Sequence, residues 1–282
     1  MNQKKSVIAR NGAKRNDVEI PIEHSRDCHG SDKSEPRNDK AKLVEIFSSI
    51  QGEGLRVGEK QTFVRFQGCS LKCRWCDTPE NFTYKKEYRV EEEAFSGNWV
   101  FHPNPVSPKD LTKWLKHFGN PVVSLTGGEP LEQLDFLKAW LPKVSNDFRI
   151  FLETGGVEHE ALKEVLDWVD IVSMDIKLPS SANTGDCWER HEAFLKIAKK
   201  APEFYVKIVV TEDSLSDDLE KACEMIVRND PHCYVIIQPA SATRGFKKIP
   251  SFKKLSEFAT MAEKWTPKIR VIPQTHKYLG IS

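Results

Sequence analysis

The alternation of short apolar runs with amphipathic stretches most constrains what this chain can fold into. Runs of strand type, rich in β-branched residues, occupy 43–50, 62–68, 121–127, 148–154, 170–176, 205–211, 233–239 and 268–274. Helical patterns lie between them at 107–118, 158–169, 191–201 and 215–229. Near-continuous apolar strands separated by helices are typical of parallel βα units with both sheet faces covered. The pattern predicts an α/β fold whose sheet closes into a (β/α) barrel or curls into a partial one.

Possible helix N-caps, and one break in the alternation of strands and helices, add detail to this prediction. Ser107, and either Ser214 or Ser216, stand where an N-cap hydroxyl would begin a helix. The segment 83–107 breaks the alternation, and we expect it to be an insertion near the functional site.

Polar and Gly-rich residues follow the strands in "QGCS", "TGGEP", "ETGG", "MDIK", "QPAS" and "PQTHK". In parallel α/β folds, ligands bind at the carboxyl ends of the strands. We therefore expect the functional site at that end of the sheet.

Composition and charge limit the classes of protein to which this chain can belong. Residues 1–40 hold many charges, no aromatic residue and no sustained period, which indicates a flexible polar leader before a catalytic domain at 41–282. The 42 basic and 41 acidic residues nearly cancel, so no global field attracts nucleic acid or an anionic membrane. No apolar run approaches the roughly 18 residues of a membrane span, and the start lacks a secretory signal. A cytoplasmic protein is expected.

Three of the seven cysteines, Cys69, Cys73 and Cys76, form a CxxxCxxC cluster just after a strand. A structural zinc site needs four protein ligands, and no second cysteine pair or nearby histidine follows. A four-iron cluster held by three cysteines leaves one iron open to a substrate. This spacing indicates an iron–sulfur cluster, with a zinc site completed by a remote fourth ligand as the alternative. The remaining cysteines are scattered and are read as ordinary residues.

A second signal is "SLTGGEP", which follows a strand. Gly127 and Gly128 allow a ligand to approach the backbone, and Glu129 can accept a hydrogen bond from an ammonium group. Simple punctuation between strand and helix is the alternative interpretation.

Further polar residues suggest a small heterocyclic ligand. Gln51 and Glu53 in "SIQGEG" could bind the donor and acceptor edge of a heterocycle, unless they form only a polar turn. Arg65 lies in an apolar strand, so it is either paired or positioned to clamp a carboxylate. Asp77 and Thr78 offer hard oxygen donors for magnesium, with a capping turn as the alternative.

Together with Trp75 and the GGEP motif, the cysteine spacing resembles the radical S-adenosylmethionine (SAM) superfamily. The motifs "SIQGEG", "FVRFQGCSLKCRWCDT", "SLTGGEPL", "FLETGG", "VSMDIKLPSS", "YVKIVV", "VIIQP" and "PQTHKYLGI" more closely resemble its 7-carboxy-7-deazaguanine synthases, in order from about residue 43 to 282. The resemblance implies a radical SAM lyase that converts 6-carboxy-5,6,7,8-tetrahydropterin to 7-carboxy-7-deazaguanine, with loss of ammonia, in queuosine and 7-deazapurine biosynthesis. It also implies a partial (β/α) barrel, a 4Fe-4S cluster, SAM, Mg²⁺, a homodimer and a flavodoxin- or ferredoxin-type electron donor.

The same resemblance assigns roles to individual residues. Cys69, Cys73 and Cys76 would bind the cluster and Thr78 the magnesium ion. The residues expected to contact the pterin are Ile50, Gln51, Gly52, Glu53, Arg65, Thr126, His276 and the terminal carboxylate of Ser282. The residues expected to bind SAM are Gly128, Glu129, Ser173, Asp175, Lys177 and Gln238. The chain departs from the family pattern where Ser282 replaces a proline and where "ETGG" stands for "ETNG".

Two other classes of function stay open at this stage. One is a different radical SAM enzyme, such as a glycyl-radical activase, although the "SIQGEG" and "PQTHKYLG" motifs favour a small heterocycle over a protein backbone. The other is a non-enzymatic zinc or iron–sulfur module that regulates a partner. Metal analysis separates the last from the enzymes.

Overall fold

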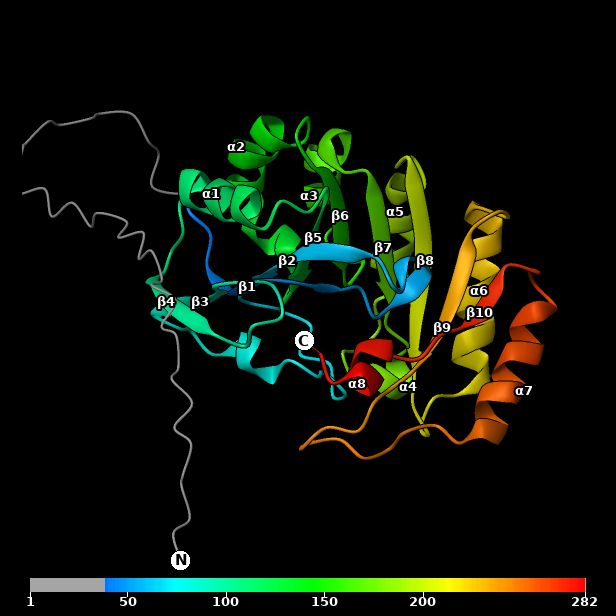
Figure 1. The fold of residues 1–282 in the computed structure, drawn as a ribbon. Helices are drawn as coiled ribbons and strands as arrows, with labels where there is room; N and C mark the ends of the chain where they lie inside the picture. The colour runs from blue at the N-terminus through cyan, green and yellow to red at the C-terminus, as the bar shows by residue number, and fades with distance from the viewer. Residues whose placement is uncertain (1–38, 282) are drawn as a thin grey trace, which may run out of the picture. The chain divides into compact units, whose positions relative to one another are not determined.

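The predicted sheet is present and has ten strands in the order β10-β9-β8-β7-β6-β5-β2-β1-β3-β4 (Figure 1). The computed structural model describes residues 39–281. The expected leader at 1–40 lies outside this range except for its last two residues, and so does Ser282. The strands are β1 (Leu43–Ile50), β2 (Lys60–Phe66), β3 (Glu87–Glu91), β4 (Trp99–Pro103), β5 (Val122–Gly127), β6 (Arg149–Thr154), β7 (Ile171–Ile176), β8 (Glu203–Val210), β9 (Tyr234–Pro239) and β10 (Ile269–Val271).

The sheet is parallel from β2 through β5 to β10, as the alternation predicts, and its two edges are β10 and β4. The expectation of parallel units is wrong for the first pair, because β1 runs antiparallel to β2. The link of residues 51–59 between them contains one short 3₁₀ turn, η1 (Gly54–Arg56). A parallel pair needs a crossover of about a dozen residues or more, so this link permits an antiparallel pair instead. The open, curled sheet matches a partial (β/α) barrel.

The segment 83–107 forms a hairpin of β3 and β4, and β3 continues the sheet beyond β1 in the parallel sense. The insertion therefore widens one edge of the sheet. None of its residues lines the cavity described below.

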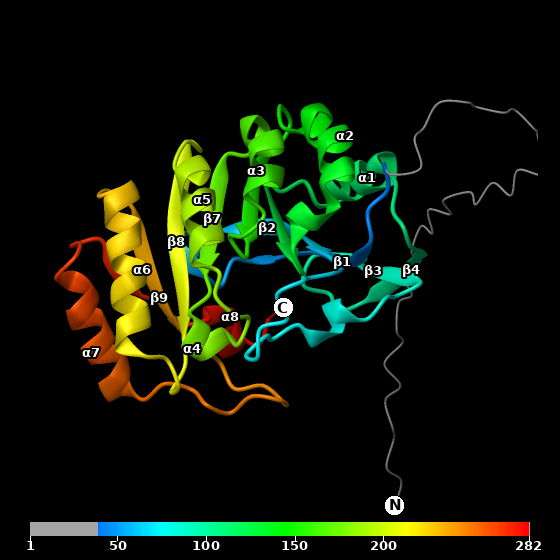
Figure 2. The same cartoon turned by 180° about the vertical axis from the view of Figure 1, so that it is seen from behind.

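Helices cover the outer face of the sheet, as the two opposite views show (Figures 1 and 2). They are α1 (Pro108–Phe118), α2 (Leu134–Val144), α3 (His159–Val165), α5 (Trp188–Ala198), α6 (Ser216–Asn229) and α7 (Phe252–Glu263). The short helices α4 (Pro179–Ala182) and α8 (Thr275–Leu279) lie instead at the carboxyl ends of the strands (Figures 1 and 2). The chain also forms the 3₁₀ turns η2 (Pro79–Phe82), η3 (Pro130–Gln133) and η4 (Leu166–Trp168). None of the helices within residues 39–281 has the length and apolar character that crossing a membrane requires.

The predicted cap at Ser107 is confirmed, since its hydroxyl accepts a hydrogen bond from the backbone N–H of Asp110 at 3.2 Å. The predicted cap of α6 is wrong. Leu215 occupies the N-cap position, and the Ser214 hydroxyl accepts from the Thr211 N–H within the preceding loop at 2.9 Å. Ser216 is already the first residue of the helix.

Side chains alternate along the strands and divide the sheet into two faces. The outer face carries the apolar residues that pack under the helices, such as Leu125, Leu152 and Ile208. The inner face begins with a second apolar cluster: Val122, Phe151, Ile171, Tyr205 and Ile236.

Two to four residues further along, the same inner face becomes polar at Glu153, Ser173, Asp175, Lys207 and Gln238. The apolar cluster forms a packed floor that closes one end of the partial barrel. It leaves the carboxyl ends of the strands to line a polar site.

Candidate active site

A cavity of about 350 Å³ lies at the carboxyl ends of the strands, above the apolar floor. Every sequence-predicted site residue within the described range lines it: Ile50, Gln51, Gly52, Glu53, Arg65, Cys69, Cys73, Cys76, Thr78, Thr126, Gly128, Glu129, Ser173, Asp175, Lys177, Gln238 and His276. Segments more than 200 residues apart in the chain thus meet around one space.

The three clustered cysteines lie on the loop that follows β2. All three are half-buried and free, and the loop turns back on itself through the Cys76 N–H, which donates to the Cys73 carbonyl at 3.0 Å. Burial raises the pKa of Cys73 to about 11 and raises that of Cys69 as well. These thiols stay protonated at neutral pH until a cation competes for the sulfur. Three thiols from one loop facing one cavity fit an iron–sulfur cluster.

Gly128 holds this loop against the end of β5. The Glu129 N–H donates to the Gly68 carbonyl at 2.7 Å, and a Cβ built on Gly128 would lie 1.7 Å from that same oxygen. Position 128 therefore requires glycine, because the carbonyl of Gly68, the residue before Cys69, leaves no room for a Cβ.

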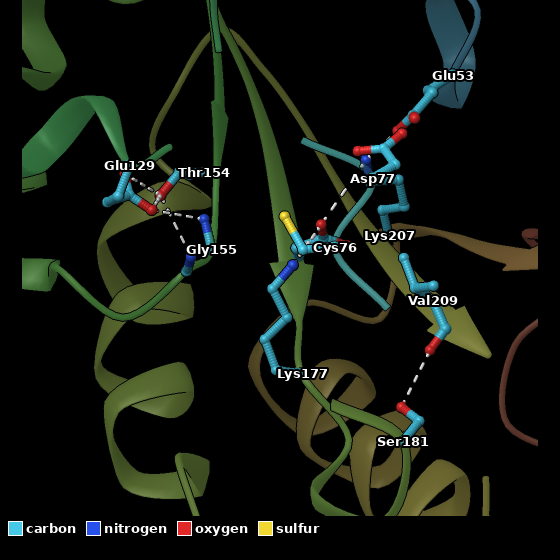
Figure 3. Close-up of polar contacts among 12 residues, drawn as sticks. Glu53, Cys76, Asp77, Glu129, Thr154, Gly155, Lys177, Ser181, Lys207 and Val209 are labelled. Atoms are coloured by element: carbon cyan, nitrogen blue, oxygen red, sulfur yellow. Dashed lines mark hydrogen bonds and ion pairs between the residues drawn. The ribbon is translucent and has the colours of Figure 1, made fainter. Parts of the chain in front are cut away.

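Glu129 is a buried carboxylate whose described hydrogen-bond donors are all neutral. It accepts from the Thr154 hydroxyl at 2.9 Å and from the backbone N–H groups of Gly155 at 2.7 Å and Leu131 at 3.1 Å (Figure 3). Burial outweighs these bonds and raises the pKa of Glu129 to about 7. A ligand cation would supply the missing countercharge.

Lys177 extends into the cavity beside the cluster loop (Figure 3). Its ammonium pairs with Asp175 Oδ2 at 2.7 Å and lies 4.6 Å from the centre of the Trp75 ring. Three buried polar atoms of residues that line this region have no hydrogen-bond partner within residues 39–281: Trp75 Nε1, Asp175 Oδ1 and Gln238 Oε1. Buried polar atoms are nearly always paired, so these donors and acceptors fit a polar ligand such as SAM.

Lys207 is a buried ammonium at the centre of the cavity that the sequence interpretation missed. It pairs with Glu53 and lies 3.7 Å from Asp175 Oδ2 (Figure 3). Burial alone would raise the pKa of Glu53, but Lys207 and a hydrogen bond from Gln274 hold it well below its usual value. The signal was available, because a lysine inside the apolar run "YVKIVV" poses the same problem as Arg65 in its own strand.

Glu153 is a second missed residue. Its Oε1 accepts from Gln51 Nε2 at 2.9 Å and from the Ser124 hydroxyl at 2.8 Å, and burial raises the pKa of its carboxyl group. Gln51 Oε1 in turn accepts from the Glu53 N–H at 2.9 Å. Both ends of the Gln51 amide thus contact protein groups, which fixes the Gln51 side chain between the Glu153 carboxylate and the Glu53 backbone.

A buried histidine outside the cavity wall supports the site from behind. His191 Nε2 accepts from the Lys177 N–H at 3.0 Å, and its Nδ1 donates to the Gly156 carbonyl at 2.9 Å. Burial lowers the pKa of His191 to about 4, so the ring stays neutral and keeps one donor and one acceptor. It joins the loops after β6 and β7.

Arg65 is paired, as one interpretation of its sequence position predicted, and it also lies at the cavity. Its Nε donates to Glu45 Oε1 at 2.7 Å, while the side chain also lines the cavity. Glu45 accepts a second guanidinium, that of Arg89 from the inserted hairpin, at 2.8 Å. The pairing anchors Arg65 at the cavity edge.

The C-terminal segment folds over the opening. Gln274 Nε2 donates to Glu53 Oε1 at 2.7 Å and to Asp77 Oδ2 at 2.9 Å, and the Thr275 N–H donates to the Gly52 carbonyl at 2.9 Å. Beyond α8, Ile281 lines the cavity.

Oxygen and nitrogen donors for a metal ion gather under this segment. The ligand atoms of Glu53, Asp77 and His276 lie within 4.8 Å of one another. Thr78 Oγ1, the expected magnesium ligand, accepts from Asn81 Nδ2 at 3.0 Å and retains a free lone pair. The two carboxylates and the Thr78 hydroxyl are oxygen ligands of the kind that a hard divalent cation prefers, and Lys207 and Lys277 pair with Glu53 and Asp77.

Comparison with known proteins agrees with this geometry. Residues 63–226 match the model of the radical SAM superfamily. The 7-carboxy-7-deazaguanine synthase of Geobacter sulfurreducens is 39% identical over 85% of this chain and 97% of its own length. That of Thermococcus kodakarensis is 31% identical over 85% of this chain and 98% of its own. The crystal structure of QueE from Escherichia coli shares the fold with a TM-score of 0.50 at 19% identity, over 82% of this chain and 94% of that one. The chain belongs to the 7-carboxy-7-deazaguanine synthase family of the radical SAM superfamily.

Proposed function

We propose that this enzyme converts 6-carboxy-5,6,7,8-tetrahydropterin to 7-carboxy-7-deazaguanine with loss of ammonia, for queuosine and 7-deazapurine biosynthesis. One observation carries the proposal. Three cysteine thiols and a buried carboxylate without a cationic partner share a cavity with Arg65, which can grip a substrate carboxylate.

Cys69, Cys73 and Cys76 would hold a 4Fe-4S cluster with one open iron, and SAM would bind beside it. Together these groups supply, when bound, the radical that removes a hydrogen atom from the pterin. The chain itself contributes a site closed by a packed apolar floor and by the C-terminal segment, which limits access of water to so reactive a species.

The SAM pocket would consist of Gly128, Glu129, Ser173, Asp175, Lys177 and Gln238. Glu129 would accept the SAM ammonium, which provides the countercharge that its buried carboxylate lacks. Asp175 Oδ1 and Gln238 Oε1 are acceptors still free for ligand hydroxyl or amine groups. These features support one orientation of SAM relative to the cysteine loop.

The pterin would contact Ile50, Gln51, Gly52, Glu53, Arg65, Thr126 and His276. Arg65 is fixed through Nε by Glu45, so its remaining N–H groups are oriented for a carboxylate. Glu53 is held ionised by Lys207 and can accept from ring N–H groups. Thr78 would bind magnesium at the substrate carboxylate, with Asp77 and His276 close by.

We further propose a cytoplasmic homodimer reduced by a flavodoxin- or ferredoxin-type carrier. The resemblance to the family supports this part of the proposal.

The test is anaerobic reconstitution with iron and sulfide, then incubation with SAM, a reductant, magnesium and 6-carboxytetrahydropterin, with products identified by mass. We expect 7-carboxy-7-deazaguanine from the wild type and from Cys233→Ala, a control at a buried cysteine outside the cavity. Cys73→Ala should lose both iron and product. Cleavage of SAM to 5′-deoxyadenosine with the pterin untouched would retain the radical chemistry and contradict the substrate.

A further inference from the structure

The surface beside the cysteine loop concentrates positive charge in a chain that is otherwise balanced. Residues 240–255, which join β9 to α7, include five basic and no acidic residues. The exposed cations on this surface, called the cationic rim below, are Lys72, Arg74, Arg244, Lys247, Lys248 and Lys253. Lys72 and Arg74 belong to the cysteine loop itself.

The two loops that carry the cationic rim are in contact. Asp213 accepts from Arg74 Nη2 at 2.6 Å and from Lys248 Nζ at 2.9 Å, so its carboxylate is neutralised between them. The Arg74 guanidinium lies 5.7 Å from the centre of the Phe246 ring, which also packs near Trp75. Because Lys72 and Arg74 flank Cys73 directly, the rim begins next to one of the three clustered cysteines.

Exposed apolar side chains lie within the rim. Leu215, Ile249 and Phe252 are 60%, 49% and 86% exposed. The Glu212 N–H donates to the Lys248 carbonyl at 2.9 Å, and the Ser251 N–H donates to the Glu212 carboxylate at 2.9 Å. These bonds hold the apolar residues on two adjoining loops and occupy the Glu212 carboxylate. Two other acidic residues lie nearby: Glu257, which lies 3.9 Å from Lys253 Nζ, and the exposed Asp217 after Leu215.

Figures 1 and 2 show the loop after β9, in orange, at the same end of the molecule as the cyan loop after β2. A radical SAM enzyme requires a reductant, and electron transfer weakens steeply with distance. A protein that delivers electrons must therefore dock close to the cysteine loop.

We propose that the cationic rim and its apolar centre dock an acidic one-electron carrier protein. The proposal rests on the assigned radical chemistry. One electron passes from the carrier, which is oxidised by one electron, to the cluster held by the three cysteines, which is reduced by one. Opposite charge raises the encounter rate, and a small apolar centre suits a transient complex that must release its partner after each transfer.

The test compares reductants of opposite character on the reconstituted enzyme. Arg244→Glu/Lys247→Glu reverses two rim charges that make no described ion pair. Lys143→Glu/Lys163→Glu makes the same change in net charge on α2 and α3 and serves as the control. The probes are flavodoxin hydroquinone, an acidic protein, and reduced methyl viologen, a small cation. The measurements are the second-order rate of cluster reduction and the dissociation constant of oxidised flavodoxin.

We expect the rim variant to slow reduction by flavodoxin at least about tenfold and to weaken flavodoxin binding. It should leave iron content, reduction by methyl viologen and product formation with methyl viologen unchanged. The wild-type rate should fall as salt rises, and the rim variant should lose most of this dependence. The control variant should match the wild type.

Three results would overturn the proposal: a rim variant that matches the wild type with flavodoxin, equal losses with both reductants, or a wild type that flavodoxin does not reduce. Loss of binding to added transfer RNA with unchanged flavodoxin kinetics would instead assign the rim to nucleic acid. Failure of the assigned reaction is distinguishable, because it would appear as missing product with methyl viologen in the wild type.

Discussion

Lys207 and Glu53 form an ion pair inside the cavity although they lie 154 positions apart in the chain. The ammonium also lies 3.7 Å from Asp175, so one buried cation connects the expected pterin and SAM pockets. Removing it would leave Glu53 without its ionic partner, whereas Asp175 would keep Lys177 at 2.7 Å.

Lys207→Met should destabilise the protein by about 3–5 kcal/mol, because breaking a buried pair strands a charge. The stabilising effect of the lowered Glu53 pKa is present above its ordinary value of 4.5 and is lost as pH falls below it. The variant should lack that contribution in urea unfolding at pH 7. Lys207→Met/Glu53→Gln is the matched control and should recover part of the loss; a single variant as stable as the wild type would disprove a stabilising pair.

Arg65→Lys should raise the KM for the pterin, since a point ammonium cannot reproduce a bidentate guanidinium. Arg89→Lys is its control, because Arg89 shares Glu45 but does not line the cavity. In steady-state kinetics, the kcat/KM of Arg65→Lys should be lower than that of Arg89→Lys by roughly tenfold or more. Equal effects would mean that Glu45 pairing, rather than substrate contact, explains the role of Arg65.

The proposed contact between Glu129 and the SAM ammonium should make SAM affinity depend on pH. Its folded-state pKa of about 7 exceeds the ordinary 4.5, so the ligand-free protein should lose about 3 kcal/mol of stability as pH rises from 4.5 to 7. SAM binding to the ionised form should strengthen over the same range. Calorimetric titration of the reconstituted enzyme, in buffers of different ionisation enthalpy, measures the accompanying proton release.

Glu129→Gln should bind SAM more weakly and remove the pH dependence of both stability and affinity. Above pH 7, this variant should also unfold at a higher urea concentration than the wild type. Wild-type affinity that stays flat between pH 5 and 8 would show that Glu129 does not pair with the SAM ammonium.

Gly128→Ala should impair cluster assembly, because its new methyl group would meet the Gly68 carbonyl beside Cys69. Overpacking of this kind costs about 1–3 kcal/mol and displaces the cysteine loop. Iron and sulfide content after reconstitution gives the readout. Gly245→Ala, where a Cβ meets nothing within 4 Å, should assemble normally; full iron content in both variants would contradict this view of the loop.

Much of this site could be predicted because its residues carry local patterns. The cysteine spacing, the GGEP turn and the polar residues after each apolar strand all belong to short segments, and parallel strands bring their carboxyl ends together whatever lies between. Arg65 illustrates this reasoning, since the difficulty of burying an unpaired guanidinium predicted either a pairing or a place at a ligand site, and the structure shows the pairing with Glu45 at the cavity.

The partners of the missed residues lie on distant segments, although Lys207 itself gave the same local signal as Arg65. Lys207 pairs with Glu53 and lies near Asp175, and Glu153 accepts a hydrogen bond from Gln51. None of these partners is close in sequence to the residue it contacts. The antiparallel direction of β1 was not predicted, because its composition is similar to that of the parallel strands. The short link of residues 51–59 between β1 and β2 could have indicated it. At α6, local propensity favoured a serine cap, whereas the Ser214 hydroxyl formed a bond within the preceding loop.

The placement of Ile281 at the cavity has a practical consequence for handling the protein. Residues 274–281 supply bonds to Glu53, Asp77 and Gly52, so an affinity tag attached after them would begin at the mouth of the active site. Tags for purification belong at the other terminus. Truncation before residue 274 would remove these bonds after the last strand has ended at Val271, and it would therefore leave an intact sheet around an open site.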